Sequence, residues 1–198
     1  MPITPFHFGS GLLLKAYLPT QVSWVVFVIA NLLIDVEPIL WFVITGVPAH
    51  RELHSYLGAA CVAAVSVWPG RVAGEFWLRW WNRQLSPSQA RWLGTSAHIA
   101  LSAAVAGALL GSSTHILQDS VMHADLQPFW PWSDSNDLLN RMPLDVLHGL
   151  CIVAALWGGL RLALMAWVTL PSNRWGNLLR ISAQVLEPVA AAMLIIIV

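Results

Sequence analysis

Three side chains of types that bind metal ions recur one helical turn apart near the middle of the chain: His115, Asp119 and His123. On an α-helix this spacing leaves a drift of only about 40° between successive members, so all three would line one face. Imidazole nitrogen and carboxylate oxygen are ligands that Zn²⁺, Mn²⁺ and Fe²⁺ accept, and Asp125 follows as a further candidate. A solvated helix end is the simpler explanation for any one of these residues. The row of three, with the group described next, predicts a metal site.

A second group of candidate ligands lies earlier in the chain. His50 and His54, in the sequence HRELH, would share one face if that segment is helical. Taken alone, such a pair is a weak signal, because paired histidines are common in helices by chance. Asp35 lies within an apolar run, where an ionisable side chain is by default a functional-site candidate.

Composition indicates what surrounds these residues. The chain is 57% hydrophobic and only 10% charged, whereas an ordinary soluble domain has about 25% charged residues. Its twelve Trp are typical of a membrane interface, where one edge of the indole ring is wet and the other apolar. These numbers predict a single integral membrane domain over residues 1–198, all-α in class. The formal net charge of zero argues against a nucleic-acid partner, which would require a basic surface.

The first two apolar runs, residues 6–18 and 22–34, predict a hairpin of two short helices. Each run covers roughly 20 Å, less than the ~30 Å hydrocarbon core of a bilayer. Because His7 and Asp35 are about equally far from the turn, the hairpin would bring them to one depth. Pro38 is expected to end the second helix. The alternative is one continuous span over residues 22–44, which would leave His7 on the opposite side.

Charge asymmetry predicts the orientation of the remaining helices. Residues 71–92 contain four Arg interleaved with aromatic side chains, which is typical of an amphipathic helix on the cytoplasmic membrane surface. A short helix over residues 56–68, closed by Pro69, would precede it. Residues 94–115 would cross outward, residues 145–168 would return, and residues 181–198 would cross again. The predicted bundle therefore has about four full spans in addition to the hairpin.

This orientation would gather the candidate ligands on the outer side. The expected metal ligands are His7, Asp35, His50, His54, His115, Asp119 and His123, with Asp125 and His148 as additional candidates. Separate helices that offer His and Asp at one depth can build a two-ion site. The acid-rich loop over residues 124–143 would cover it, with Phe129, Trp130 and Trp132 as a substrate lid. We exclude His98, which is about 25 Å along its helix from His115.

Four segments carry a family resemblance: MPITPFHFGSGLLLK, IDVEPI, HRELHSYLGA and THILQDSVMHADLQPFWPWS. They resemble the YdjM-type family of predicted membrane-bound metal-dependent hydrolases, over most of the chain up to about His148. More distantly, His115 and Asp119 are similar to the HxxxD metal-binding helix of zinc-dependent phospholipase C and related single-strand nucleases. The resemblance implies hydrolysis of phosphodiesters with clustered zinc ions.

We therefore predict a membrane-embedded, metal-dependent hydrolase that cleaves a phosphoester of a lipid or lipid-linked substrate. The expected location is a bacterial-type inner (plasma) membrane, with the site facing the outer side. Two zinc ions are expected, with Mn or Fe as alternatives. Asp35 is the candidate general base, unless it is itself a metal ligand. The sequence does not specify an oligomeric state.

Three other functions remain open at this point. A zinc-dependent lipid amidase of the ceramidase kind would use three His, an Asp and a Ser, and Ser112, Ser113 and Ser120 are available. A di-iron lipid oxidase usually has an HxxHH element, and no adjacent His pair occurs here. A metal transporter would distribute its polar groups through the membrane depth instead of gathering them at one level.

Overall fold

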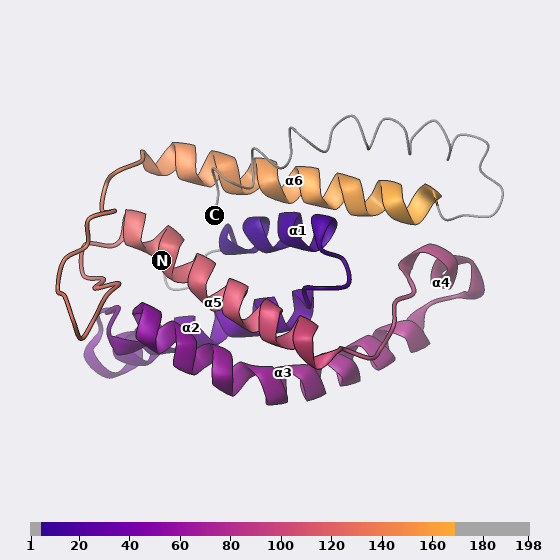
Figure 1. Cartoon of the computed structure of the whole chain (residues 1–198), viewed down its shortest axis with the longest axis horizontal. Coiled ribbons are helices and arrows are strands. Elements are labelled where there is room, and N and C mark those ends of the chain that lie inside the picture. The colour runs from indigo at the N-terminus through magenta and orange to yellow at the C-terminus, as the bar shows by residue number, and fades with distance from the viewer. Residues whose placement is uncertain (1–4, 169–198) are drawn as a thin grey trace.

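The computed structural model describes residues 5–168, and within this range the chain forms helices and no strand. The α-helices, labelled in Figure 1, and one short 3₁₀-helix, η1, follow in chain order: α1 (His7–Tyr17), α2 (Trp24–Thr45), η1 (Glu52–His54), α3 (Tyr56–Gln84), α4 (Pro87–Leu93), α5 (Leu101–Met122) and α6 (Leu144–Val168). The all-α class predicted from the sequence is confirmed for the described residues.

Three of these helices, α2, α3 and α6, are long and apolar enough to cross a membrane. The central helix α5 was expected to cross as well, but the polar side chains of its second half lower its hydropathy, and it is not among the three. The span predicted over residues 181–198 lies outside the described residues. Length and composition therefore support membrane association through three helices.

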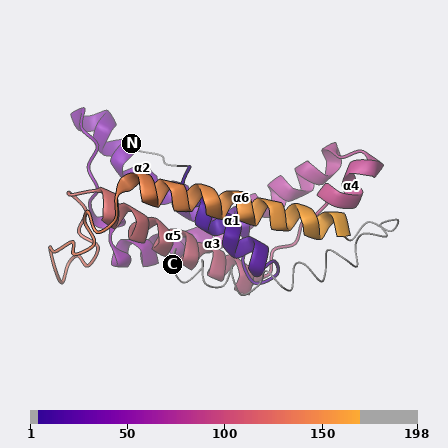
Figure 2. The same cartoon turned by 90° about the horizontal axis from the view of Figure 1, so that it is seen from above.

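The helices form a bundle in which α5 packs against α2 and α3, while α1 packs mainly against α6. Figures 1 and 2 both place α4 at one end of the long axis and the loop that joins α5 to α6 at the other. Because α3 runs from the loop end toward α4 and α5 runs back, the first turn of α3 lies beside the last turns of α5. This antiparallel pairing brings the His54 region to the His115 region.

A close approach between α2 and α5 brings Asn31 and Asp35 to the level of the α5 histidines. A Cβ atom on Gly111 would lie 2.6 Å from the carbonyl oxygen of Phe27, so only glycine allows the two backbones this proximity. The Asn31 amide donates to the Gly111 carbonyl across the same contact, at 3.1 Å.

Two prolines that were predicted to end helices lie inside them instead. Pro38 lies inside α2, which continues to Thr45 and ends where Gly46 adopts φ 78°. Pro69 lies inside α3, so the segment expected to be a separate surface helix over residues 71–92 is the second half of α3 followed by α4. A long apolar helix tolerates the backbone bond lost at a proline, because neighbouring helices and local adjustments compensate for it.

The predicted N-terminal hairpin correctly places His7 and Asp35 at one depth, but its second helix is longer than predicted. The chain turns between α1 and α2, and the two helices contact each other. His7 begins α1 and Asp35 lies midway along α2, so both reach the same level of the bundle. The single-span alternative is right that α2 is continuous, but His7 does not lie at the opposite end from Asp35.

Candidate metal centre

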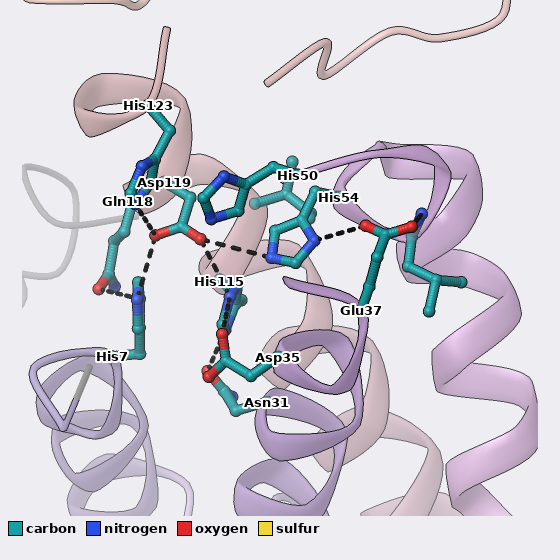
Figure 3. A network of polar contacts seen from close by, with 12 residues as sticks. His7, Asn31, Asp35, Glu37, His50, His54, His115, Gln118, Asp119 and His123 are labelled. Carbon is teal, nitrogen blue, oxygen red and sulfur yellow. Dashed lines mark hydrogen bonds and ion pairs between the residues drawn. The ribbon is translucent and has the colours of Figure 1, made fainter. Parts of the chain in front are cut away.

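The seven predicted metal ligands converge at the loop end of the bundle. They come from the start of α1, the middle of α2, the connection between α2 and α3, and the last turns of α5 (Figure 3). Ligand atoms of these residues lie within 4.8 Å of one another in overlapping groups of three. The groups are His7, His115 and Asp119; Asp35, His54 and His115; His50, His54 and Asp119; and His50, His123 and Asp125.

The Asp119 carboxylate lies at the middle of the cluster. Its Oδ1 is 3.2 Å from Nε2 of His7 and 3.9 Å from Nε2 of His123. Its Oδ2 is 3.1 Å from Nε2 of His115 and 3.7 Å from Nε2 of His54. The two oxygens therefore face two different sets of imidazoles, and the carboxylate itself is buried.

Asp35 completes the cluster from the α2 side. Its Oδ1 lies 3.5 Å from Nε2 of His115, whose imidazole stacks on that of His7 with ring centroids 4.2 Å apart. A second carboxylate is thus next to a histidine that also faces Asp119. Asp35 keeps a small exposed fraction, while His115 has none.

The orientation of His115 is set by Asn31, a residue that the sequence analysis missed. The Asn31 Nδ2 donates to the carbonyls of Phe27 and Gly111, at 3.0 and 3.1 Å. Its Oδ1 must therefore be the acceptor for Nδ1 of His115, at 3.1 Å. Because Nδ1 carries a hydrogen, the neutral ring presents the lone pair of Nε2 to the cluster.

Gln118 fixes His7 in the same way and was also missed. The Gln118 Nε2 donates to Oγ of Ser10 at 3.1 Å, which leaves Oε1 to accept from Nδ1 of His7 at 3.0 Å. The His7 imidazole consequently directs its Nε2 at Asp119. Helix α1 is thereby tied to α5 through side chains that lie next to the cluster.

The HRELH segment reaches the cluster without forming the α-helix that was predicted. His50 lies in the connecting loop and His54 at the end of η1. The Glu37 carboxylate shapes this turn, since it accepts hydrogen bonds from the backbone N–H groups of Arg51 and Leu53, both at 2.9 Å. It also accepts from Nδ1 of His54 at 2.9 Å, so Nε2 of His54 faces Asp119.

His50 has a carboxylate partner of its own in Asp125. The Asp125 Oδ2 accepts from both the backbone N–H and Nδ1 of His50, each at 3.0 Å. Burial raises the pKa of Asp125, but the hydrogen bonds from the two His50 donors lower it by more than burial raises it. The net pKa of Asp125 therefore lies below the usual value. Asp125 therefore remains ionised and orients His50, in addition to its place in the group with His123.

His123 follows the last residue of α5 and is held by the next loop. Asn136 donates to the carbonyls of Ser120 and His123, at 2.9 and 3.2 Å, which satisfies backbone acceptors at the helix end. The His123 and His50 rings lie 4.0 Å apart between centroids. The predicted row on α5 is therefore present, although its last member is the cap of the helix and not part of it.

Four imidazoles, those of His7, His50, His54 and His115, are thus held at Nδ1 by an acceptor. Among the described residues, the buried Nε2 atoms of His54 and His115 and the Oδ1 of Asp119 have no hydrogen-bond partner. Buried acceptors that face one another without a donor are unfavourable. A proton would relieve one such contact, whereas a divalent cation relieves several at once, and histidines with a partner on the other ring nitrogen are typical of metal sites. These residues could hold a metal ion.

Several candidates lie apart from this cluster. His148 stacks on Phe6 with ring centroids 4.1 Å apart and belongs to none of the ligand groups in the described residues. His98, which was excluded, lies in the connection between α4 and α5, 3.4 Å from the Glu75 carboxylate. In the predicted lid, Phe129 contacts Tyr56 with rings 5.4 Å apart, and Trp132 is exposed. Trp130 lines a small pocket next to His50.

The missed residues have one recognisable signal. Asn31 lies one helical turn before Asp35, and Gln118 lies next to Asp119. Uncharged amides within apolar helices need hydrogen-bond partners, as charged groups do. A polar residue within one turn of a candidate ligand, as Asn31 is of Asp35 and Gln118 is of His115, is therefore a signal for a residue that orients the ligands.

Comparison with known proteins adds no relative to this description. No protein-family model, curated protein or solved structure matches the chain at a significant level. The case for a function therefore rests on the residues of the cluster and the helices that hold them.

Proposed function

We propose that this chain is a membrane-embedded, metal-dependent hydrolase that cleaves a phosphoester of a lipid or lipid-linked substrate. The observation that carries the proposal is the set of imidazoles whose Nδ1 atoms are held by acceptors and whose remaining nitrogens surround Asp119. The motif resemblance to membrane-bound metal-dependent hydrolases agrees with this chemistry.

The overlapping groups of ligand atoms would suit two divalent ions, which we propose to be zinc, with Asp119 contributing to both sites. His7 faces Oδ1 of Asp119, while His54 and His115 face Oδ2. A carboxylate with ligands on both oxygens is suited to bridge neighbouring cations. Two cations about 3.5–4 Å apart would lower the pKa of a bound water, orient phosphoryl oxygens and neutralise charge on the leaving group.

Asp35 is the proposed general base. It borders the cluster through His115 and keeps slight exposure, so a water beside it can transfer a proton to its carboxylate. The water oxygen then bonds to phosphorus, the ester P–O bond breaks, and the departing alkoxide takes up a proton. The products are an alcohol and a phosphoryl compound that has gained the hydroxyl of water.

The surroundings of the cluster favour a lipid over a soluble phosphoester. Beyond Asp35, the last turns of α2 expose apolar side chains next to the site: Leu40, Phe42, Val43 and Ile44. The helices that supply Asp35 and adjoin His54 are long and apolar enough to cross a membrane. Acyl chains would reach the cluster from the bilayer along this surface.

The amidase alternative receives less support from the serines. Ser112 and Ser120 donate to the carbonyls of Leu109 and Ile116 within their own helix, at 3.3 and 2.6 Å. These bonds direct the hydroxyls along α5 instead of into the cluster. We therefore favour phosphoester hydrolysis, and metal analysis separates it from di-iron oxidation.

Incubating the purified full-length chain with a bacterial lipid extract tests this function. We expect zinc-dependent loss of a phospholipid and appearance of its hydrolysis product by mass spectrometry. Removing zinc with a chelator should abolish the conversion, and restoring zinc should recover it. Release of a fatty acid from an amide instead, or iron with an optical absorption band, would contradict the proposed reaction.

We propose that the metal centre faces the outer side of a bacterial-type inner membrane. The Arg-rich half of α3 and the acid-rich loop over residues 124–143 lie at opposite ends of the bundle (Figure 2). Arg and Lys are enriched on the cytoplasmic side of membrane proteins. Single cysteines at Arg83 and Asp134, in a variant lacking the native Cys, should react with an impermeant reagent from the inside and the outside, respectively. Labelling of both from one side would contradict this orientation.

A further inference from the structure

A small polar pocket opens beside the metal centre and shares residues with it. Its volume is about 130 Å³, and it is lined by His50, Arg51, Glu52, Asp125, Gln127 and Trp130. The cluster is closed at His115, which is fully buried, and open toward Asp125, whose side chain is half-exposed. A polar group that approaches the metal centre from this side would pass through the pocket.

Arg51 supplies a cation to this pocket. Within residues 5–168 its guanidinium has no carboxylate partner; it lies over the ring of Trp41, at 4.8 Å from the centroid. The Arg51 backbone is anchored by its N–H bond to Glu37, the same carboxylate that holds His54. The Arg51 backbone is thus held next to the ligands, while the guanidinium donors remain available to an anion such as phosphate.

Glu52 supplies the opposite charge. Its carboxylate is exposed and has no ion pair with any other described residue, whereas Asp125 in the same pocket is engaged by His50. The pocket therefore combines one available cation with one available anion. A phosphate that carries an amine a short distance away matches this pair.

Size narrows the choice of ligand. Pockets that enclose drug-sized ligands have volumes of about 300–1,000 Å³, so about 130 Å³ is too small for a nucleotide or a sugar headgroup. A phosphate joined to a short primary amine is compact. A primary ammonium also donates hydrogen bonds to a carboxylate, which a quaternary ammonium cannot do.

We propose that this pocket binds a phosphoethanolamine headgroup, with Arg51 contacting the phosphate and Glu52 the ammonium. Phosphatidylethanolamine-type lipids are then the substrate class of the hydrolase, an inference that rests on the proposed function. Arg51 and Glu52 act in substrate binding and belong to none of the metal-ligand groups.

Steady-state kinetics of the zinc-loaded full-length chain in detergent test the proposal with dihexanoyl phosphatidylethanolamine and dihexanoyl phosphatidylglycerol. Phosphatidylethanolamine should be the better substrate. Arg51→Gln should raise KM for both lipids by about tenfold, the effect of one lost charged hydrogen bond. Glu52→Gln should raise KM for phosphatidylethanolamine alone. The control Arg141→Gln, in the loop after α5 and outside the pocket lining, should change neither KM.

Metal content separates a binding role from damage to the centre, since all three variants should retain the zinc of the wild type. Free phosphoethanolamine should inhibit weakly compared with the lipid KM, because it lacks acyl chains; inhibition as tight as lipid binding would indicate a soluble ligand and overturn the lipid assignment. Equal turnover of both lipids, or an equal effect of Glu52→Gln on both, would also overturn the proposal.

Calorimetric binding of dihexanoyl phosphatidylethanolamine distinguishes failure of the pocket from failure of the hydrolase. Binding that Arg51→Gln and Glu52→Gln weaken, without any turnover, would support the pocket and contradict the hydrolase. Turnover of phosphatidylglycerol alone, unaffected by these variants, would support the hydrolase and contradict the pocket. If neither binding nor turnover is observed, both the pocket and the hydrolase proposals are overturned.

Discussion

Replacing Asp119 by Ala is expected to remove bound zinc and abolish phosphoester cleavage together. Both Asp119 oxygens face imidazole nitrogens, and the carboxylate faces ligands from α1, η1 and α5 at once. Loss of an outer partner of a metal ligand typically costs 10–100-fold in metal affinity or activity. Loss of the central ligand should therefore exceed about 100-fold. Metal per chain after gel filtration, measured by mass spectrometry, and lipid turnover are the two readouts.

His98→Ala is the matched control for this experiment. His98 is exposed, pairs with Glu75 and belongs to none of the ligand groups in the described residues, so zinc content and turnover should equal those of the wild type. An Asp119→Ala protein that is folded and keeps its full complement of zinc would show that the cluster around Asp119 is not the metal site.

His7→Ala should lower zinc content as much as His115→Ala does, although the two residues lie on different helices. His7 reaches Asp119 at 3.2 Å and is oriented by Gln118, so it is placed as a ligand from α1. Without its imidazole the Asp119 oxygen on that side loses its nearest nitrogen. Zinc affinity, measured by competition with a chromogenic chelator, is the readout.

The control for the N-terminal helix is His148→Ala. His148 stacks on Phe6, next to His7 in the chain, and belongs to none of the ligand groups in residues 5–168. This variant should therefore bind zinc like the wild type. Wild-type zinc affinity in His7→Ala, with His115→Ala still defective, would place the centre on α2 and α5 without a ligand from α1.

Regular periodicity made the α5 part of the centre predictable. Residues one turn apart share a helical face whatever the tertiary context, so the approach of His115 to Asp119 followed from spacing. The common depth of His7 and Asp35 could be predicted because both are about equally far from the turn between α1 and α2. That distance depends only on the rise per residue of a helix. Neither prediction required knowledge of side-chain contacts.

Helix boundaries and the HRELH segment could not be predicted from local pattern. Pro38 and Pro69 lie within helices because tertiary packing tolerates a missing backbone bond. The path of residues 50–54 is set by the Glu37 carboxylate, which accepts two backbone N–H bonds from a segment beyond its own helix. Such a contact joins parts of the chain whose proximity only the folded bundle creates.

The partners of the histidines were unpredictable for a related reason. Asn31 reaches His115 because Gly111 allows α2 and α5 to approach closely, and spacing along either helix does not reveal that approach. The role of Asp125 likewise depends on the loop that carries His50. Candidate ligands could be read from residue type, whereas their orientation required the packed structure.

The most direct test of the metal centre is zinc stoichiometry and X-ray absorption on the purified wild-type chain after zinc is supplied. We predict about two zinc ions per chain, each bound by imidazole nitrogen and carboxylate oxygen, as expected for a two-ion hydrolytic site. A folded, monodisperse chain that binds no zinc, manganese or iron under these conditions would contradict the account.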